Sequence, residues 1–188
     1  IVLVLRQLAK LDGTGLADAA AARGLDRYVS GRSIKGEAEL DWDSAKERTR
    51  LLRAIVADAD GLLGEVRTVR GRLEPGTVAD EALAQAAERL GQVLLQDIER
   101  GEAGPVLRVG VAKGRMPSVH DPEMRHGHKS AHKRFDGHKA QVAVDTESQL
   151  IMAVAVLGGN EPDSAWALAL VAAAEQDSEA EVAEMLLD

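Results

Sequence analysis

The spacing of the apolar residues changes along the chain, and this change most constrains the fold. Behind Ser44 the apolar residues recur at helical spacing, and they do so again between Thr77 and Ile98. Ser44 followed by Glu47 is a capping-box pattern, and Thr77 is a good N-cap residue. Two long antiparallel helices are therefore predicted, and the second is expected to include Ile98 and to be closed by Gly101.

From Gln141 onward the apolar period is two. The runs "QVAVD" and "LIMAVAVL" are aliphatic and β-branched, and the polar "TESQ" separates them, which predicts a hairpin over 140–157. Both faces of its second strand are apolar, so cover is expected on both sides. Pro162 and Asp163 predict the start of a helix over 164–176, with Asp163 as its N-cap.

The composition sets outer limits on the class of protein. The chain has 188 residues, of which 45% are hydrophobic and only 2% aromatic, so an aliphatic core is expected. The absence of cysteine excludes a disulfide scaffold and a thiolate zinc site, and it is compatible with a cytoplasmic location. Arg6 interrupts the opening "IVLVLRQLAK", which is too short to span a membrane, and we expect it to be the broken end of a longer chain.

The charge is distributed unevenly. The chain carries −8 overall, but Arg108–Lys139 holds eight Lys and Arg residues against three acidic ones, so this segment carries +5 and the remainder −13. All five histidines lie between His120 and His138 in the same basic segment. Such asymmetry is typical of a localised contact with a polyanion.

The histidines suggest a metal site as one alternative, because His126 and His128 would lie on one side of an extended segment. The surrounding Lys and Arg side chains would repel a metal ion, so no stoichiometric zinc is expected. Phosphate is the better ligand: Arg offers a planar fork, Lys a mobile charge and His a donor. A solvated, solubilising surface remains the plain alternative.

Three carboxylates fall at the ends of predicted elements. Asp145 opens the "DTESQ" turn and is expected to be a turn residue. Asp163 is expected to be a cap, as above. Asp188 ends the apolar run "EVAEMLLD", which helix propensity alone would make helical.

The stretches "DPEMRHGHKS" and "KRFDGHKAQVAVDTESQLIMAVAVLGGNEPD" together resemble the middle of a DDE transposase from a bacterial insertion sequence. The elements that carry the resemblance are Arg-x-Gly-x-Lys-Ser from Arg125 and Phe-Asp-Gly-x-Lys from Phe135. The resemblance extends back through "LDRYVSGRSIKGEAELDWDSAKERTRLLRAIVADADGLL", which is similar to the helical insert of one large branch of these enzymes. It covers most of the chain.

The resemblance implies a mixed α/β fold. A mainly helical insert and linker over 1–107 would precede a partial ribonuclease-H-like domain over 108–188, built from the hairpin, a crossover helix and a further strand over 182–187. Asp188 would then match the second catalytic position and act as a metal ligand. The first catalytic Asp would precede the insert and the catalytic Glu would follow Asp188, so the chain is expected to be a fragment with one acid of three.

The family's chemistry is strand cleavage and transfer of DNA, which requires Mg²⁺ held by converging carboxylates. The resemblance implies that the intact enzyme binds transposon ends and target DNA as a homo-oligomer, at the nucleoid and away from membranes, and that this segment alone is inactive. The basic segment would hold the DNA backbone without reading its sequence. The residues assigned to DNA are Arg125, His128, Lys129, Lys133, Arg134 and Lys139.

Two other interpretations stay open. One is a non-enzymatic DNA-binding remnant of a truncated transposase gene. The other is a metal-binding protein that uses the histidine loop. An Asp at the end of an upstream strand and a Glu on a downstream helix would indicate an intact enzyme.

Overall fold

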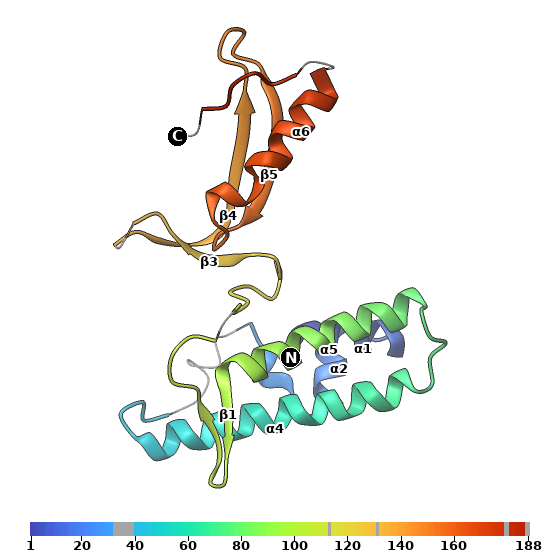
Figure 1. The fold of residues 1–188 in the computed structure, drawn as a ribbon. Helices are drawn as coiled ribbons and strands as arrows, with labels where there is room; N and C mark the ends of the chain where they lie inside the picture. Colours follow the sequence, from blue (N-terminus) through green and yellow to red (C-terminus); the bar gives the residue numbers. More distant parts are fainter. Residues whose placement is uncertain (32–39, 113, 131, 179–180, 187–188) are drawn as a thin grey trace. The chain divides into compact units, whose positions relative to one another are not determined.

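The computed structural model of the chain describes residues 1–31, 40–112, 114–130, 132–178 and 181–186. It has a mixed α/β composition and divides into two compact units, Ile1–Lys113 and Gly114–Asp188 (Figure 1). The first is mainly helical, and the second is an antiparallel sheet with one long helix. Each unit is described by itself.

Two long helices, α4 (Ala45–Arg70) and α5 (Val78–Asp97), lie antiparallel and in contact in the first unit (Figure 1). The predicted starts of both helices are confirmed. The Ser44 hydroxyl accepts the N–H of Glu47 at 3.4 Å, and the Thr77 hydroxyl accepts the N–H of Asp80 at 3.3 Å. Each cap satisfies one of the backbone donors that the first turn of a helix leaves without a partner.

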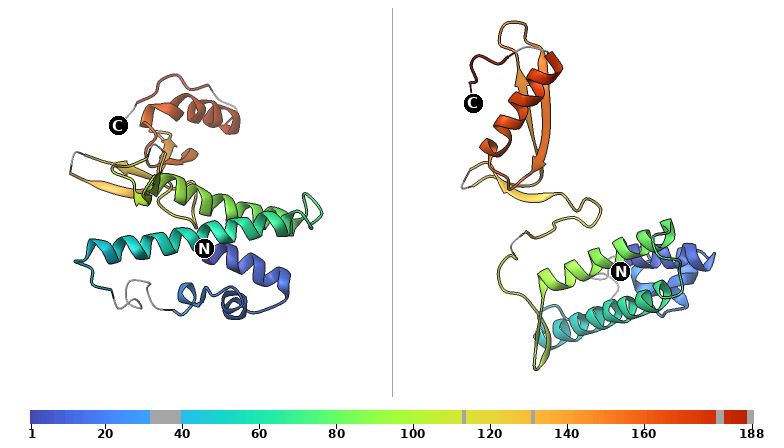
Figure 2. Two further views of the ribbon diagram at one scale, coloured as in Figure 1. Left: turned by 90° about the horizontal axis from the view of Figure 1, so that it is seen from below. Right: turned by 45° about the vertical axis from the view of Figure 1, so that its right-hand side comes forward.

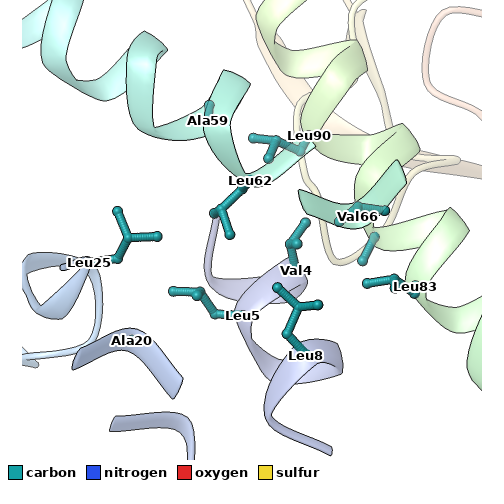
Figure 3. Packing of buried hydrophobic residues seen from close by; sticks show 11 residues of the cluster. Val4, Leu5, Leu8, Ala20, Leu25, Ala59, Leu62, Val66, Leu83 and Leu90 are labelled. Carbon is teal, nitrogen blue, oxygen red and sulfur yellow. The ribbon is translucent and has the colours of Figure 1, made fainter. Parts of the chain in front are cut away.

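The opening apolar run forms α1 (Val2–Asp12), and its apolar face packs against α5 and the shorter α2 (Leu16–Ala21). Leu5 and Leu8 are buried there, together with Leu83 of α5 (Figure 3). A fully buried leucine contributes about 1.5–3 kcal/mol relative to an exposed one. The first unit therefore has an aliphatic core to which α1, α2, α4 and α5 all contribute.

The end of α5 differs from the prediction. The helix stops at Asp97, and the chain continues as a small antiparallel hairpin of β1 (Ile98–Gly101) and β2 (Gly104–Leu107). The β1 strand has the sequence "IERG", which has no alternating apolar pattern. Pairing with β2, rather than side-chain pattern, makes it a strand. The 3-10 turn η1 (Asp26–Tyr28) completes the described elements of this unit.

The second unit contains a three-stranded antiparallel sheet in the order β3-β4-β5. The predicted hairpin over 140–157 is confirmed by β4 (Arg134–Val144) and β5 (Ile151–Gly158). In this register Val142 lies opposite Val154, and Ala140 lies opposite Val156. The strand β4 extends six residues further toward the N-terminus than the apolar pattern indicates, and this extension pairs with β3 (Arg125–His128).

The helix predicted over 164–176 is present as the short η2 (Asp163–Trp166) followed by α6 (Ala167–Ser178). Figures 1 and 2 show α6 lying along one face of the β4–β5 pair, in agreement with its contacts to both strands. The opposite face is open among the described residues: Val154 is 59% exposed and Val156 67%. The expectation of cover on both faces is therefore wrong for the described part of the chain, because α6 is the only described helix that packs on this sheet.

The strand expected over 182–187 is not formed in residues 181–186, which have no regular secondary structure. A strand needs a neighbour to accept and donate its ladder hydrogen bonds. Here the N–H of Val182 instead donates to the side chain of Glu175, at 3.0 Å. Residues 187 and 188, with the catalytic and metal-binding role predicted for Asp188, lie outside the described residues.

Candidate nucleic-acid interface

From Arg125 onward the basic segment folds as a β-hairpin, made of β3 and the first half of β4, rather than as the loop that its charge suggests. His126 lies opposite Asp136, and His128 lies opposite Arg134. The N–H of Lys129 donates to the carbonyl of Lys133 at 2.8 Å and closes the turn. In "RHGH" the exposed residues, His126 and His128, alternate with the less exposed Arg125 and Gly127. The four residues include no large apolar side chain, so the spacing of apolar residues does not indicate a strand here.

Three cations gather at the tip of this hairpin: Lys129, Lys133 and Arg134, called the hairpin tip below. All three side chains are exposed, and no carboxylate in the described part of the chain forms an ion pair with them. The hydroxyl of Ser130 accepts the N–H of Lys133 at 3.1 Å and helps to hold the turn. The tip therefore presents three available positive charges on a closed turn.

The other two cations assigned to DNA are engaged within the unit. Arg125 donates from Nη1 to the carbonyls of Pro122, at 2.5 Å, and of Met124, at 2.8 Å. Lys139 donates to the carbonyl of Glu161, at 2.8 Å, and to Oδ1 of Asp163, at 2.9 Å. Their assignment to DNA stays a prediction, but both side chains already have partners in the fold.

Two histidines pair with carboxylates. Nδ1 of His126 lies 2.7 Å from Oδ1 of Asp136, and Nε2 of His138 lies 2.8 Å from Oδ2 of Asp121. The hydrogen bond with His138, aided by the N–H groups of Met124 and Glu123, lowers the pKa of the Asp121 carboxyl. Within the described ranges no group of three or more His, Asp or Glu side chains could hold a metal ion.

Glu161 holds the loop that follows β5. Oε1 of Glu161 accepts the N–H of Gly158, and Oε2 accepts the indole N–H of Trp166, both at 3.0 Å. These hydrogen bonds, with the nearby charge of Arg125, lower the pKa of the Glu161 carboxyl. The sequence pattern did not single out Glu161. Its only sequence signal is its place in "GGNEPD", next to the glycines.

The structure confirms the role predicted for Asp145 and contradicts the one predicted for Asp163. Asp145 is a turn residue, as predicted: its Oδ2 accepts the N–H of Ser148 at 2.8 Å and also the Ser148 hydroxyl. These two hydrogen bonds lower the pKa of the Asp145 carboxyl. The prediction that Asp163 is an N-cap is wrong, because η2 has no side-chain cap and the Asp163 carboxylate pairs with Lys139 instead.

Comparison of the chain with models of protein families, with curated proteins and with solved structures found no match. The resemblance to DDE transposases therefore rests on the sequence motifs described above. Among the described helices, none combines the length and apolar character needed to cross a membrane.

Proposed function

We propose that this chain is the DNA-contacting central part of a DDE transposase of the bacterial insertion-sequence type. The observation that carries the proposal is the hairpin tip, where Lys129, Lys133 and Arg134 are exposed and without an ion-pair partner in the described structure. These residues fall within or between the two motifs of the resemblance, Arg-x-Gly-x-Lys-Ser and Phe-Asp-Gly-x-Lys.

The chemistry of the tip suits a phosphate backbone. Lys is a mobile point charge, and Arg adds a planar fork that can hold two phosphate oxygens. Contacts of this kind fix the position of a protein on DNA and carry no sequence information by themselves. The hairpin tip would hold the DNA backbone in place, and sequence would be read elsewhere in the intact protein.

The order of elements supports the transposase assignment further. A β-hairpin followed by α6 is the order expected ahead of the second catalytic Asp of a ribonuclease-H-like domain, and we propose Asp188 for that position. The described residues do not by themselves offer a site for Mg²⁺. We therefore assign the metal-dependent strand cleavage and transfer to the intact enzyme, a homo-oligomer acting on DNA in the cytoplasm at the nucleoid.

A second candidate is a DNA-binding protein that does not cut. It is favoured by residues 181–186, which do not form the strand that would present Asp188 to a catalytic site. Strand cleavage, assayed in a chain that carries all three catalytic carboxylates, separates the two candidates. Both share the DNA contact of the hairpin tip.

The contact is tested by the salt dependence of binding to a short labelled duplex, measured by fluorescence anisotropy on the whole chain. Replacing Lys129, Lys133 and Arg134 together by Ala should weaken binding and reduce the slope of log affinity against log salt by about 0.9 for each phosphate that the variant no longer neutralises. The matched control removes three exposed cations of the helical unit, Lys10, Lys46 and Arg50.

The control variant has the same net charge as the hairpin-tip variant, so a general charge effect would change both slopes equally. We expect the control to keep the slope of the unmodified chain. Equal slopes for the two variants would show that the hairpin tip is not the contact.

A further inference from the structure

We infer that the side of the hairpin next to the tip is an acid-dependent surface for DNA phosphates, which strengthens binding as the pH falls. This surface, called the histidine face below, consists of His126, His128, Arg134, Asp136, His138 and Asp121. The inference rests on the proposed function, because it names a regulation of the same DNA contact.

The strand register places these residues on one side of the sheet. Directly opposed residues of an antiparallel pair project to the same face, and so do residues two apart along a strand. His126 is opposite Asp136 and His128 is opposite Arg134, so all four share a face. Along β4, His138 follows on the same side, and its ring holds Asp121 from the preceding segment.

The face is open to solvent and carries two imidazole–carboxylate pairs. The side chains of His126 and Asp136 are 51% and 55% exposed, and those of His138 and Asp121 are 30% and 41% exposed. In each pair one ring nitrogen meets the carboxylate, at 2.7 Å for His126 and 2.8 Å for His138. The second ring nitrogen of each imidazole can take up a proton without breaking the pair.

Protonation reverses the sign of the face. With neutral imidazoles the face carries one positive charge, on Arg134, and two negative charges, on Asp121 and Asp136, which gives −1. With three imidazolium groups it carries +2. Imidazoles change charge between about pH 5 and pH 8, where aspartates remain ionised. The net charge of the face therefore becomes favourable for phosphate in mild acid.

The other charged groups nearby do not cancel this change. At the turn, Lys129 and Lys133 add positive charge beside the face. His120 and Glu123 flank Asp121 in the preceding segment. On the opposite side of the sheet the charged groups are already engaged: Arg125 with backbone carbonyls, Lys139 with Asp163, and Glu161 with Gly158 and Trp166.

The ring nitrogens of His126 and His138 that do not meet a carboxylate could donate hydrogen bonds to phosphate. His126 meets Asp136 through Nδ1, so a proton added at Nε2 creates an N–H that no carboxylate of the pair occupies. In His138 the roles of the two nitrogens are exchanged, because Nε2 faces Asp121. Each protonated ring adds a donor as well as a charge, and hydrogen bonds to phosphate are stronger when the donor is ionised.

The experiment measures affinity for a short DNA duplex at about pH 7.5 and about pH 5.5, at constant salt, with the whole chain. We expect binding to tighten about tenfold or more in acid, and the salt slope to steepen by roughly 1 to 3 as new phosphate contacts form. Replacing His126, His128 and His138 together by Gln should remove most of this gain.

The matched control replaces the two other histidines, His120 and His132, by Gln, and it should keep most of the gain. Circular dichroism at both pH values checks that each variant is folded. If the triple variant fails to fold, His128→Gln alone, which disturbs neither carboxylate pair, should remove about a third of the gain in log affinity. Gln accepts and donates hydrogen bonds but cannot gain a proton in this range.

The possible results separate the two proposals. A full pH gain in the triple variant, or its loss in the control, would overturn the inference. In either case the proposed function stands as long as the hairpin-tip variant binds DNA more weakly than the unmodified chain. Absence of DNA binding by the unmodified chain at both pH values would overturn both proposals.

Discussion

Gly127 in β3 lies directly against the backbone of Gly159, so closely that a Cβ on Gly127 would be 2.2 Å from the Gly159 carbonyl oxygen. The Phe135 ring closes the other side, with its Cζ 2.7 Å from the same position. The N–H of Gly159 in turn donates to the carbonyl of Gly137 at 3.0 Å. The chain after β5 therefore packs closely against the β3–β4 hairpin, and only glycine fits at position 127.

Gly127→Ala should destabilise the second unit by about 2–3 kcal/mol, because the added methyl group overlaps backbone rather than a flexible side chain. Urea unfolding followed by the fluorescence of Trp166 measures this, in a Trp42→Phe background that leaves Trp166 as the only tryptophan. Gly61→Ala is the control. Gly61 is exposed in α4, and apart from its chain neighbours and the nearby backbone of the helix nothing lies within 4 Å of its Cβ position, so the change should stabilise the helical unit by up to about 1 kcal/mol. An unchanged midpoint for Gly127→Ala would mean that the close contact is absent in solution.

Asp80 should make the stability of the helical unit depend on pH. It is only 6% exposed, and it accepts hydrogen bonds from Arg70, at 2.5 Å and 3.2 Å, and from the N–H of Gly76, at 3.2 Å. The Arg70 guanidinium, followed by the Gly76 N–H, lowers the pKa of the Asp80 carboxyl. A carboxyl whose pKa is lowered by folding stabilises the fold above its unfolded-state pKa of about 3.9, and this stabilisation is lost as the pH falls through the folded-state value.

Asp80→Asn should therefore lower the thermal midpoint at neutral pH, and the difference from the unmodified chain should shrink below about pH 4. Far-ultraviolet circular dichroism across the acid range measures both midpoints. Asp60→Asn is the control. It removes an ion pair of the same kind, with Arg100, that is exposed to solvent, and it should change the midpoint little at any pH. A difference for Asp80→Asn that stays constant into strong acid would exclude the ion pair as its cause.

Asp188→Asn should abolish strand cleavage in a chain that carries all three catalytic carboxylates, because it removes a negative charge from the predicted catalytic position. DNA binding through the hairpin tip should remain. Asp145→Asn is the control, since Asn serves the turn held by Ser148 nearly as well, and cleavage should stay within roughly tenfold. The reverse pattern, with Asp145 essential and Asp188 dispensable, would refute the assignment of Asp188.

Local interactions made several elements predictable from the sequence alone. The caps at Ser44 and Thr77 each join a side chain to a backbone N–H three residues away, and Asp145 holds Ser148 over the same separation. Such hydrogen bonds depend on a few neighbouring residues, so residue type and spacing predict them. The β4–β5 hairpin was predictable for a related reason, because a short polar turn joins two runs of aliphatic and β-branched residues.

Tertiary structure decided what depends on residues distant in the sequence. "RHGH" and "IERG" become strands because a partner accepts their ladder hydrogen bonds, and residues 181–186 have no such strand partner within the described part of the chain. The charges of Lys129 and Lys139 look alike in the sequence, but Lys139 meets the carboxylate of Asp163 across 24 positions, and Lys129 meets none among the residues that the structure describes. Composition determined that this segment is basic. The folded contacts determined which cations remain available, because a charge held by a partner has already exchanged its water for that partner.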